Sequence, residues 1–295
     1  MQPRHVLLAV AVAALWGSNF VAVHVALETV QPLFLAFLRF SIAAMPALFV
    51  PRPAVSWPRM GAIAATLFIG QFGFLFVGMH EGMPPGLASV VTQAQALITV
   101  LLAAGFLGET PAPRQWAGIA VAALGLVLIG SGIGRDGVTG IGLLMTILAA
   151  ASWAVGNVLL RRVGQVAMFP LVVWLSVIPP LPLLALSLVL ERPFAPMTTG
   201  SATLVCAAAA IAYIALAATL LGYGLWGHLL KLYPAARVAP FALLVPIFGL
   251  LAAWLVVGEQ FGTTRIIGIA IVFAGLAIAN MHLGLRLIRR RPGRT

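Results

Sequence analysis

The sequence predicts an all-α membrane protein with ten transmembrane helices, arranged as two inverted five-helix repeats. Three observations support this fold class. First, 62% of the 295 residues are hydrophobic, only 8% are charged and the mean hydropathy is +1.10, whereas soluble domains carry roughly 25% charged residues. Second, apolar windows long enough to cross a bilayer follow one another along the chain. Third, two stretches of the chain match at a constant offset of 150 residues.

Each apolar window is about 20 residues long, which is the length a helix needs to cross the hydrocarbon core of a bilayer. In chain order the windows fall at 5–27, 33–50, 59–79, 85–106, 114–131, 139–160, 168–190, 202–227, 235–257 and 264–286. The first window runs to about Leu27 with no small-residue cleavage site, so we interpret it as a helix and not as a signal peptide. Prolines interrupt the second, seventh and ninth windows, so these helices are expected to be the least regular.

The repeat is clearest over residues 78–109, which read GMHEGMPPGLASVVTQAQALITVLLAAGFLGE. Moving the sequence by 150 positions places Pro84 on Pro234 and Glu109 on Glu259, and the match continues to Gly125, which falls on Gly275. A constant offset over this length indicates an internal repeat. We therefore predict a first repeat over 1–132, a second repeat over 138–286 and a basic tail over 287–295.

The positive charges predict the orientation of the chain. With the N-terminus in the cytoplasm, twelve Lys and Arg residues fall in inner loops and tails, and three (Arg135, Arg192 and Arg265) in outer loops. This bias predicts that both termini are cytoplasmic, which agrees with an even number of crossings. Since each repeat has five crossings, the second repeat must be inverted relative to the first. Secondary transporters use this arrangement, with the substrate site near the membrane midplane, although channels also use it.

The charge distribution, the single cysteine and the absence of catalytic motifs argue against a nucleic-acid partner, an enzyme and a bound metal or cofactor. The formal net charge is +11, but the arginines flank apolar windows and no basic run alternates with aromatic residues, so no nucleic-acid partner is expected. The one cysteine, Cys206, lies in an apolar window and is expected to be a packed thiol. The sequence has no H-E-x-x-H, no G-x-S-x-G and no acidic cluster, so we expect neither an enzyme nor a bound metal or cofactor.

Two pairs of residues occupy corresponding helices of the repeats. Trp16 and Asn19 lie in the segment W-G-S-N-F of the first window, and Trp153 and Asn157 lie in the sixth; each pair shares a helix face. Together with P-x-G-L-A-S, Q-A-Q and the two G-E ends, this duplicated set resembles the EamA family of the drug/metabolite transporter superfamily, and most of all its bacterial amino-acid and metabolite exporters. The resemblance covers nearly the whole chain and implies that the fifth and tenth helices lie at the periphery.

The polar residues inside the windows narrow the substrate. They are Asn19, Gln71, Thr92, Gln93, Gln95, Asn157, Tyr213, Tyr223 and Asn280, with no Asp or Glu at a helix centre. Carriers of lipophilic cations usually need a buried carboxylate, and carriers of phosphorylated sugars need Lys or Arg in the cavity. Arg39 lies near the outer end of the second window and is expected to snorkel, and Arg237 begins the ninth window. A neutral or zwitterionic solute fits what remains.

An amino acid suits such a site because amide N–H groups hold its carboxylate and aromatic faces hold its ammonium group, which is worth about 0.5–2 kcal/mol. The candidate substrate-binding residues are Trp16, Asn19, His80, Gln93, Gln95, Trp153, Asn157, Tyr223 and Trp226. Each has an alternative role. The two asparagines either line the pathway or bond helix to helix, only one of the two glutamines is expected to face the pathway, and His80 is either a solvated turn residue or a proton carrier.

Helix breaks and small residues supply the candidate moving parts. The candidate hinge residues are Pro240, Pro246, Gly70, Gly73, Gly222 and Gly224. Glu109 and Glu259 are expected to hold the tight turns that follow them. Stripes of small residues, Gly118, Ala122 and Gly125 with Gly268 and Gly275, are expected to pack helices closely, either within the chain or between two copies in a weak homodimer.

The sequence thus predicts a secondary transporter of the bacterial cytoplasmic (inner) membrane that exports neutral or zwitterionic amino acids or related metabolites. Its partners are a small-molecule substrate and the lipid bilayer, and it is a monomer or a weak homodimer. An exporter of drugs or other small metabolites and a membrane channel remain as alternatives. The sequence does not choose between proton coupling and facilitated diffusion.

Overall fold

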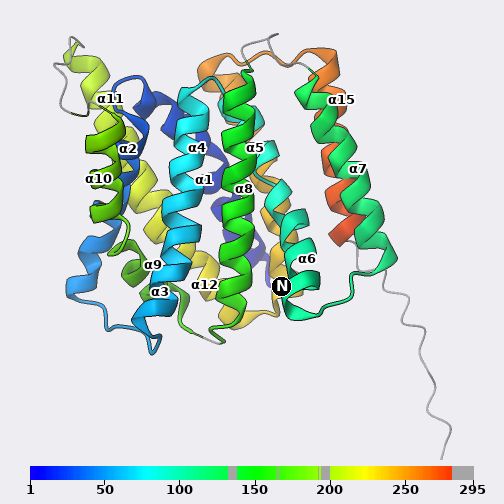
Figure 1. Ribbon diagram of the computed structural model, residues 1–295, viewed down its shortest axis with the longest axis horizontal. Helices are drawn as coiled ribbons and strands as arrows, with labels where there is room; N and C mark the ends of the chain where they lie inside the picture. The colour runs from blue at the N-terminus through cyan, green and yellow to red at the C-terminus, as the bar shows by residue number, and fades with distance from the viewer. Residues whose placement is uncertain (132–137, 165, 192, 194–199, 281–295) are drawn as a thin grey trace, which may run out of the picture.

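The computed structural model describes residues 1–131, 138–164, 166–191, 193 and 200–280. Over these residues the chain is a bundle of helices that lie side by side, and most of them span the full height of the bundle (Figure 1). Eight helices are long and apolar enough to cross a membrane, and two shorter apolar helices, Pro32–Leu48 and Thr263–Ala279, complete the set. The prediction of ten crossings is therefore confirmed for the described part of the chain.

Several crossings are built from more than one helical segment. The first five consist of α1 (Pro3–Leu27); α2 (Pro32–Ala44) with the 3₁₀-helix η1 (Met45–Leu48); α3 (Trp57–Ala64), the π-helix η2 (Ala65–Gly70) and α4 (Gln71–His80); α5 (Pro85–Val91) with α6 (Ala94–Leu107); and α7 (Pro113–Gly130).

The second five crossings are also built partly from several segments. They consist of α8 (Gly140–Arg161); α9 (Met168–Ser176) with α10 (Pro180–Leu190); α11 (Ser201–Ala212), the π-helix η3 (Tyr213–Leu221) and α12 (Gly222–Leu232); α13 (Ala235–Val238), the 3₁₀-helix η4 (Ala239–Leu244), α14 (Val245–Ala252) and the π-helix η5 (Ala253–Val257); and α15 (Thr263–Asn280).

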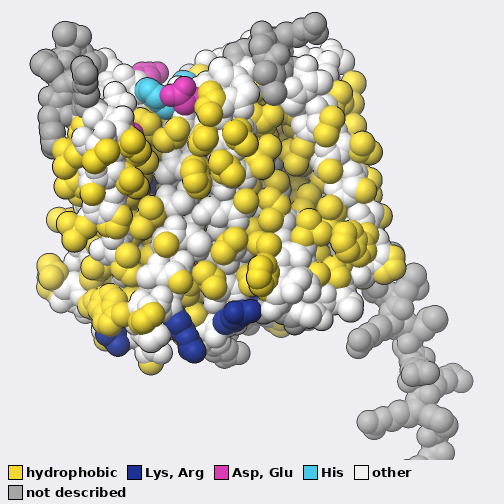
Figure 2. Space-filling model, in the orientation of Figure 1, with side chains coloured by type: hydrophobic (Ala, Val, Ile, Leu, Met, Phe, Trp, Pro, Cys, Tyr) yellow, Lys and Arg dark blue, Asp and Glu magenta, His cyan; other side chains and the backbone are white. Residues whose placement is uncertain are grey.

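The two ends of the bundle differ in charge. We call the end at which α1 begins the basic face, because the exposed arginines of the 51–59 connection and of the end of α8 lie there (Figure 2). The other end is the one at which α4 ends (Figure 1), with His80 and Glu81, and we call it the acidic face. Between the two ends, hydrophobic side chains cover the visible sides of the bundle (Figure 2), as expected for a surface in contact with lipid.

The two repeats run in opposite directions across the bundle. In Figure 1, α1 runs from the basic face to the acidic face, whereas α8, the first helix of the second repeat, runs the opposite way. Contacts between helices agree with this view. The start of α8 lies beside the end of α4, where the Thr139 N–H donates to the Gly82 carbonyl over 3.4 Å. The predicted inversion is therefore confirmed.

Helix ends follow from local sequence in the same way in both repeats. Prolines occupy the first turns of α1, α2, α5, α7 and α10, where the missing N–H has no helical partner to lose. Gly108 ends α6 and Gly258 ends η5, with φ values of 67° and 70°. This left-handed conformation favours glycine, which explains why both G-E pairs end a crossing.

The proline-containing crossings are broken as predicted, but other breaks were not expected. Pro46 lies in η1, Pro240 lies in η4 and Pro246 lies in the first turn of α14. The third, eighth and ninth crossings each contain a π-helix, and π-helices inside α-helices often occur at functional sites.

The candidate hinge glycines lie at or near these π-helices. Gly70 ends η2 and Gly222 directly follows η3. Gly73 and Gly224 lie in the first turns of α4 and α12. Their role as hinges, like that of the two prolines, stays a prediction.

The small-residue stripes pack on each other within one chain. α7 and α15 lie together at the edge of the bundle (Figure 1) and make the most extensive helix pair in the described structure. A Cβ atom added to Gly118 would lie 2.6 Å from the Gly275 carbonyl oxygen, and one added to Gly125 would lie 2.8 Å from that of Gly268. Only glycine allows these two backbones to approach so closely, and the expected peripheral position of the fifth and tenth helices is confirmed.

The prediction for Cys206 was wrong. Its thiol is exposed on the surface of α11 and is not packed in the core. An apolar window does not reveal which of its residues face lipid and which face other helices, because both environments accept the same side chains.

Candidate functional site

Three predicted aromatic residues meet between the first and eighth crossings. The ring centroids of Tyr223 and Trp226 on α12 each lie 5.2 Å from that of Trp16 on α1. Trp16 also donates its indole N–H to the Ala218 carbonyl in η3 over 2.9 Å. A Cβ atom at Gly222 would lie 2.7 Å from that indole nitrogen, so glycine is needed here for the indole to reach the helix. We call Trp16, Tyr223 and Trp226 the aromatic cluster.

Two predicted amides meet between the fourth and sixth crossings. Asn157 on α8 donates to the Gln95 side-chain oxygen on α6 over 2.9 Å, and its amide nitrogen lies 3.5 Å from the Thr99 hydroxyl. This bond joins two helices, which is the alternative role that the sequence left open for Asn157. Gln93 precedes α6 and is buried.

The remaining predicted residues lie apart from one another. His80 is exposed at the end of α4, on the acidic face, and does not lie with the aromatic cluster. Trp153 is half-buried against the main hydrophobic core. Asn19 is buried on α1, and its side-chain oxygen has no hydrogen-bond partner among the described residues.

Arg39 is the main departure from the sequence prediction, because it does not snorkel. Its side chain is only 2% exposed, and its Nε donates to the Thr219 hydroxyl in η3 over 3.1 Å. The guanidinium carbon lies 3.9 Å from the centre of the Phe72 ring and 5.6 Å from that of Phe40. A charged side chain therefore lies inside the bundle, held by one hydroxyl and by aromatic faces from α2 and α4.

The two repeats are closed against each other at the acidic face. Ser89 on α5 donates to the Pro246 carbonyl over 3.4 Å, and a Cβ atom at Gly249 would lie 2.4 Å from the Ser89 hydroxyl oxygen. Near the end of the bundle, the Gly86 N–H donates to Glu259 Oε2 over 2.8 Å. We call Gly86, Ser89, Gly249 and Glu259 the acidic gate.

Glu259 has a different role from the one predicted. It does not only follow a tight turn, since its carboxylate reaches the first turn of α5 in the other repeat. The first N–H groups of a helix lack helical partners and carry partial positive charge, so they offset part of the cost of burying this carboxylate. Glu259 therefore helps to hold the acidic gate closed.

The counterpart of this gate at the basic face has no similar closure. By the 150-residue offset, the contact of α5 with α14 corresponds to a contact of η4 with α6. α6 packs mainly on α8, and no comparable packing of α6 on η4 is present in the described residues. Glu109, the counterpart of Glu259, lies 3.3 Å from the exposed Arg161 instead. The bundle is thus closed at the acidic face and less closely packed at the basic face.

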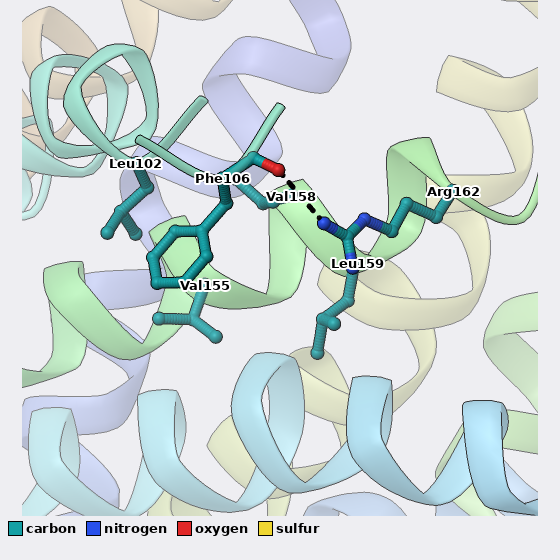
Figure 3. Close-up of a pocket in the computed structure, with 6 residues that line it drawn as sticks. All are labelled: Leu102, Phe106, Val155, Val158, Leu159 and Arg162. Atoms are coloured by element: carbon teal, nitrogen blue, oxygen red, sulfur yellow. Dashed lines mark hydrogen bonds between the residues drawn. The ribbon is translucent and has the colours of Figure 1, made fainter. Parts of the chain in front are cut away.

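A hollow of about 250 Å³ lies in this less closely packed half, between α6 and α8 (Figure 3). It is lined by Leu102, Phe106, Val155, Val158, Leu159 and Arg162. Arg162 donates to the Phe106 carbonyl over 3.2 Å at its edge. Its lining is otherwise apolar and includes none of the nine predicted substrate-binding residues.

The carboxyl group of Glu259 gives the first testable prediction. Burial raises its pKa above the ordinary 4.5, against the opposing effects of the Gly86 and Leu87 N–H groups and of Arg265. A pKa raised by folding contributes stability that is complete below the unfolded pKa and is lost as the pH rises through the folded pKa. We therefore expect the Tm of wild type minus that of Glu259→Gln to fall as the pH rises from about 4 to 7.

The measurement is a thermal scan of both proteins in detergent across this pH range. Glu81→Gln, which replaces an exposed glutamate at the same face, is scanned beside it to measure the effect of the substitution alone. A Tm difference for Glu259→Gln that stays constant across this pH range would contradict the prediction.

Ten membrane-crossing helices, an inverted repeat and polar and aromatic side chains between the repeats are the features of a membrane transporter. The sequence model of the EamA-like transporter family matches residues 4–131 and 140–281, so each repeat carries one copy. The chain therefore belongs to the EamA-like transporter family.

Curated relatives cover nearly the full chain. A protein of Salmonella typhimurium named "Probable amino-acid metabolite efflux pump" is 41% identical over 97% of this chain and 98% of its own length. A protein of the same name from Escherichia coli K12 is 39% identical over 94% of this chain and 95% of its own length. A "Probable terminal-alkyne amino-acid exporter" of Streptantibioticus cattleyicolor is 30% identical over 95% of this chain and 94% of its own length.

A solved structure, described as "Crystal structure of protein", has the same fold. It is similar with a TM-score of 0.61 at 21% sequence identity, and the match covers 95% of this chain and 97% of that one. The fold of the chain is thus one that is already known from a solved structure.

Proposed function

We propose that this protein exports neutral or zwitterionic amino acids or related metabolites across the bacterial cytoplasmic membrane, by alternating access at a site between the two repeats. The observation that carries the proposal is the aromatic cluster. It lies inside the membrane between helices of opposite repeats, where inverted-repeat transporters bind substrate. Relatives at about 40% identity, named as probable amino-acid metabolite efflux pumps, support the same substrate class.

The two faces of the bundle suggest which state is present. The excess of arginine at the basic face supports a cytoplasmic basic face, with both termini on that side. The closed acidic gate then separates the site from the outside, while the less closely packed half is on the cytoplasmic side. Export would continue by opening the acidic gate and closing η4 onto α6.

Transport by purified protein in liposomes tests the proposal. We expect saturable efflux and exchange of at least one member of a panel of neutral amino acids. Lack of flux for every member would contradict the substrate class. Flux that neither saturates nor exchanges would indicate a channel, and flux of drugs alone would indicate an exporter of another cargo.

The aromatic cluster gives a second testable prediction. Trp16→Ala removes one aromatic face from the cluster, against which the apolar part of the substrate would pack, so we expect the KM for efflux to rise about 10-fold or more, given the usual worth of burying apolar surface against an aromatic ring. Trp116→Ala, on the exposed surface of α7, is the matched control and should leave the KM unchanged. Equal effects of the two substitutions would contradict a role of the cluster in binding.

A further inference from the structure

Three buried polar atoms inside the bundle have no hydrogen-bond partner among the described residues. They are Asn19 Oδ1 on α1, Arg39 Nη1 on α2 and Gln71 Oε1 on α4. Each side chain is at most 6% exposed, and the three helices pack on one another. Buried polar groups are nearly always hydrogen-bonded, so each exception calls for an explanation.

The three residues lie at a similar depth in the membrane. All three helices have one end at the acidic face (Figure 1). With a rise of 1.5 Å per residue, Asn19 lies about 12 Å from the end of α1, Arg39 about 10 Å from the start of α2 and Gln71 about 14 Å from the end of α4. They thus form one layer, on the outer side of the membrane centre.

The buried charge of Arg39 is energetically unfavourable when no ligand is bound in this layer. A guanidinium group stays protonated, and an ionised group inside a membrane is expensive unless a partner neutralises it. Among the described residues, no carboxylate forms an ion pair with Arg39. Thr219 accepts from one of its N–H groups and three aromatic rings surround it, but Nη1 is left without an acceptor.

The free atoms match the two charged groups of an α-amino acid. Two amide oxygens accept hydrogen bonds, and one guanidinium nitrogen donates them. We propose that Arg39 binds the substrate carboxylate, while Asn19 and Gln71 accept hydrogen bonds from its ammonium group. This inference rests on the proposed function and adds the residues that recognise the amino-acid head group.

The aromatic cluster lies next to this layer, where a substrate side chain would extend. Thr219, which accepts from Arg39, directly follows Ala218, whose carbonyl accepts from Trp16. Arg39 and Trp16 are therefore held by neighbouring residues of η3. A substrate bound by its head group at Arg39 would place its apolar side chain against Trp16 and Tyr223, so the cluster contacts the variable part of the molecule.

The test compares acids with analogues that lack the carboxylate. The probes are leucine, phenylalanine and threonine, each with its primary amide, and the readout is the Kd of each by calorimetry on purified full-length protein. A charge-assisted hydrogen bond is lost in Arg39→Gln, so we expect its Kd for the acids to rise about 10- to 100-fold. Its Kd for the amides should stay near the wild-type value, and the preference for acid over amide should disappear.

Companion variants separate recognition from folding. Arg39→Lys keeps the charge and should retain a preference for acids. Gln71→Met should weaken acids and amides equally, because both carry the amino group. Arg59→Gln, at an exposed site on the basic face, is the matched control and should bind like wild type.

Two results would overturn the inference while the proposed function stands. One is an Arg39→Gln protein that binds acids and amides both more weakly by the same factor, which would indicate a structural role. The other is an Arg39→Gln protein that keeps the wild-type preference for acids. Wild-type protein that binds none of the three acids would instead contradict the proposed function, and this site with it.

Discussion

Gly249→Ala is expected to reduce transport about 10- to 100-fold while the bundle stays folded. The added Cβ would lie 2.4 Å from the hydroxyl oxygen and 2.5 Å from the Cβ of Ser89, and its next contact, at 3.5 Å, is of ordinary length. The clash therefore acts across the acidic gate and not within one helix. Overpacking of this kind costs about 1–3 kcal/mol, which lowers the population of the closed gate by up to about 100-fold.

A second substitution at Ser89 is expected to restore transport in Gly249→Ala. Since both close atoms belong to Ser89, the double variant Gly249→Ala with Ser89→Gly should recover most of the lost transport. Gly61→Ala is the matched control, because a Cβ at Gly61 has no atom within 4 Å. Failure of the double variant to recover would show that the defect does not arise at this contact.

The state of the gate can be read by labelling. In a Cys206→Ser background, which removes the exposed thiol, Gln93→Cys places a reporter beyond the gate. We expect an impermeant thiol reagent applied from the acidic face to label this position faster in Gly249→Ala than in the otherwise wild-type protein. Equal labelling would mean that Gly249 does not control access from that side.

Gly118→Leu is expected to have the largest effect on stability, with a loss of about 3 kcal/mol or more in the free energy of unfolding. A Cβ at Gly118 would lie 2.6 Å from both the Ala279 backbone nitrogen and the Gly275 carbonyl oxygen. Neither of these backbone atoms can rotate away, so α7 and α15 would have to separate along their whole contact. Helix association in membranes depends on such close packing.

The measurement is thermal unfolding in detergent, with Gly105→Leu as the control. Gly105 lies in the exposed part of α6, where an added Cβ meets no atom within 4 Å. This substitution is expected to change the Tm little. If Gly118→Leu were as stable as Gly105→Leu, the α7–α15 contact would not contribute to stability in the way the structure indicates.

The crossings and their inversion were predictable because the bilayer restricts the choices of the chain. A membrane-spanning segment must satisfy its own backbone hydrogen bonds, so a long apolar window has few alternatives to a helix. The G-E ends at Gly108 and Gly258 marked the repeat, and both glycines adopt the same left-handed conformation. Charge bias and window count were then enough to predict that the halves are inverted.

The candidate site was predictable only in part, because tertiary contacts decide it. Trp16, Tyr223 and Trp226 were selected as aromatic faces, and the structure brings them together. The position of Trp16 depends on the Ala218 carbonyl in η3, and neither hydrophobic periodicity nor helix-end signals predict a π-helix. Arg39 was expected to reach the membrane–water interface because it is close to the end of its helix. Thr219 and Phe72, from other helices, instead hold its side chain inside the bundle.

The π-helices at 65–70 and 213–221 have a consequence for experiments along these crossings. A π-helical turn holds more residues than an α-helical turn, so the 100° step per residue does not hold continuously through either segment. A residue-by-residue accessibility scan should therefore change phase between α11 and α12. Helical-wheel designs that carry one face of α11 unchanged into α12 would place their substitutions on the wrong side of α12.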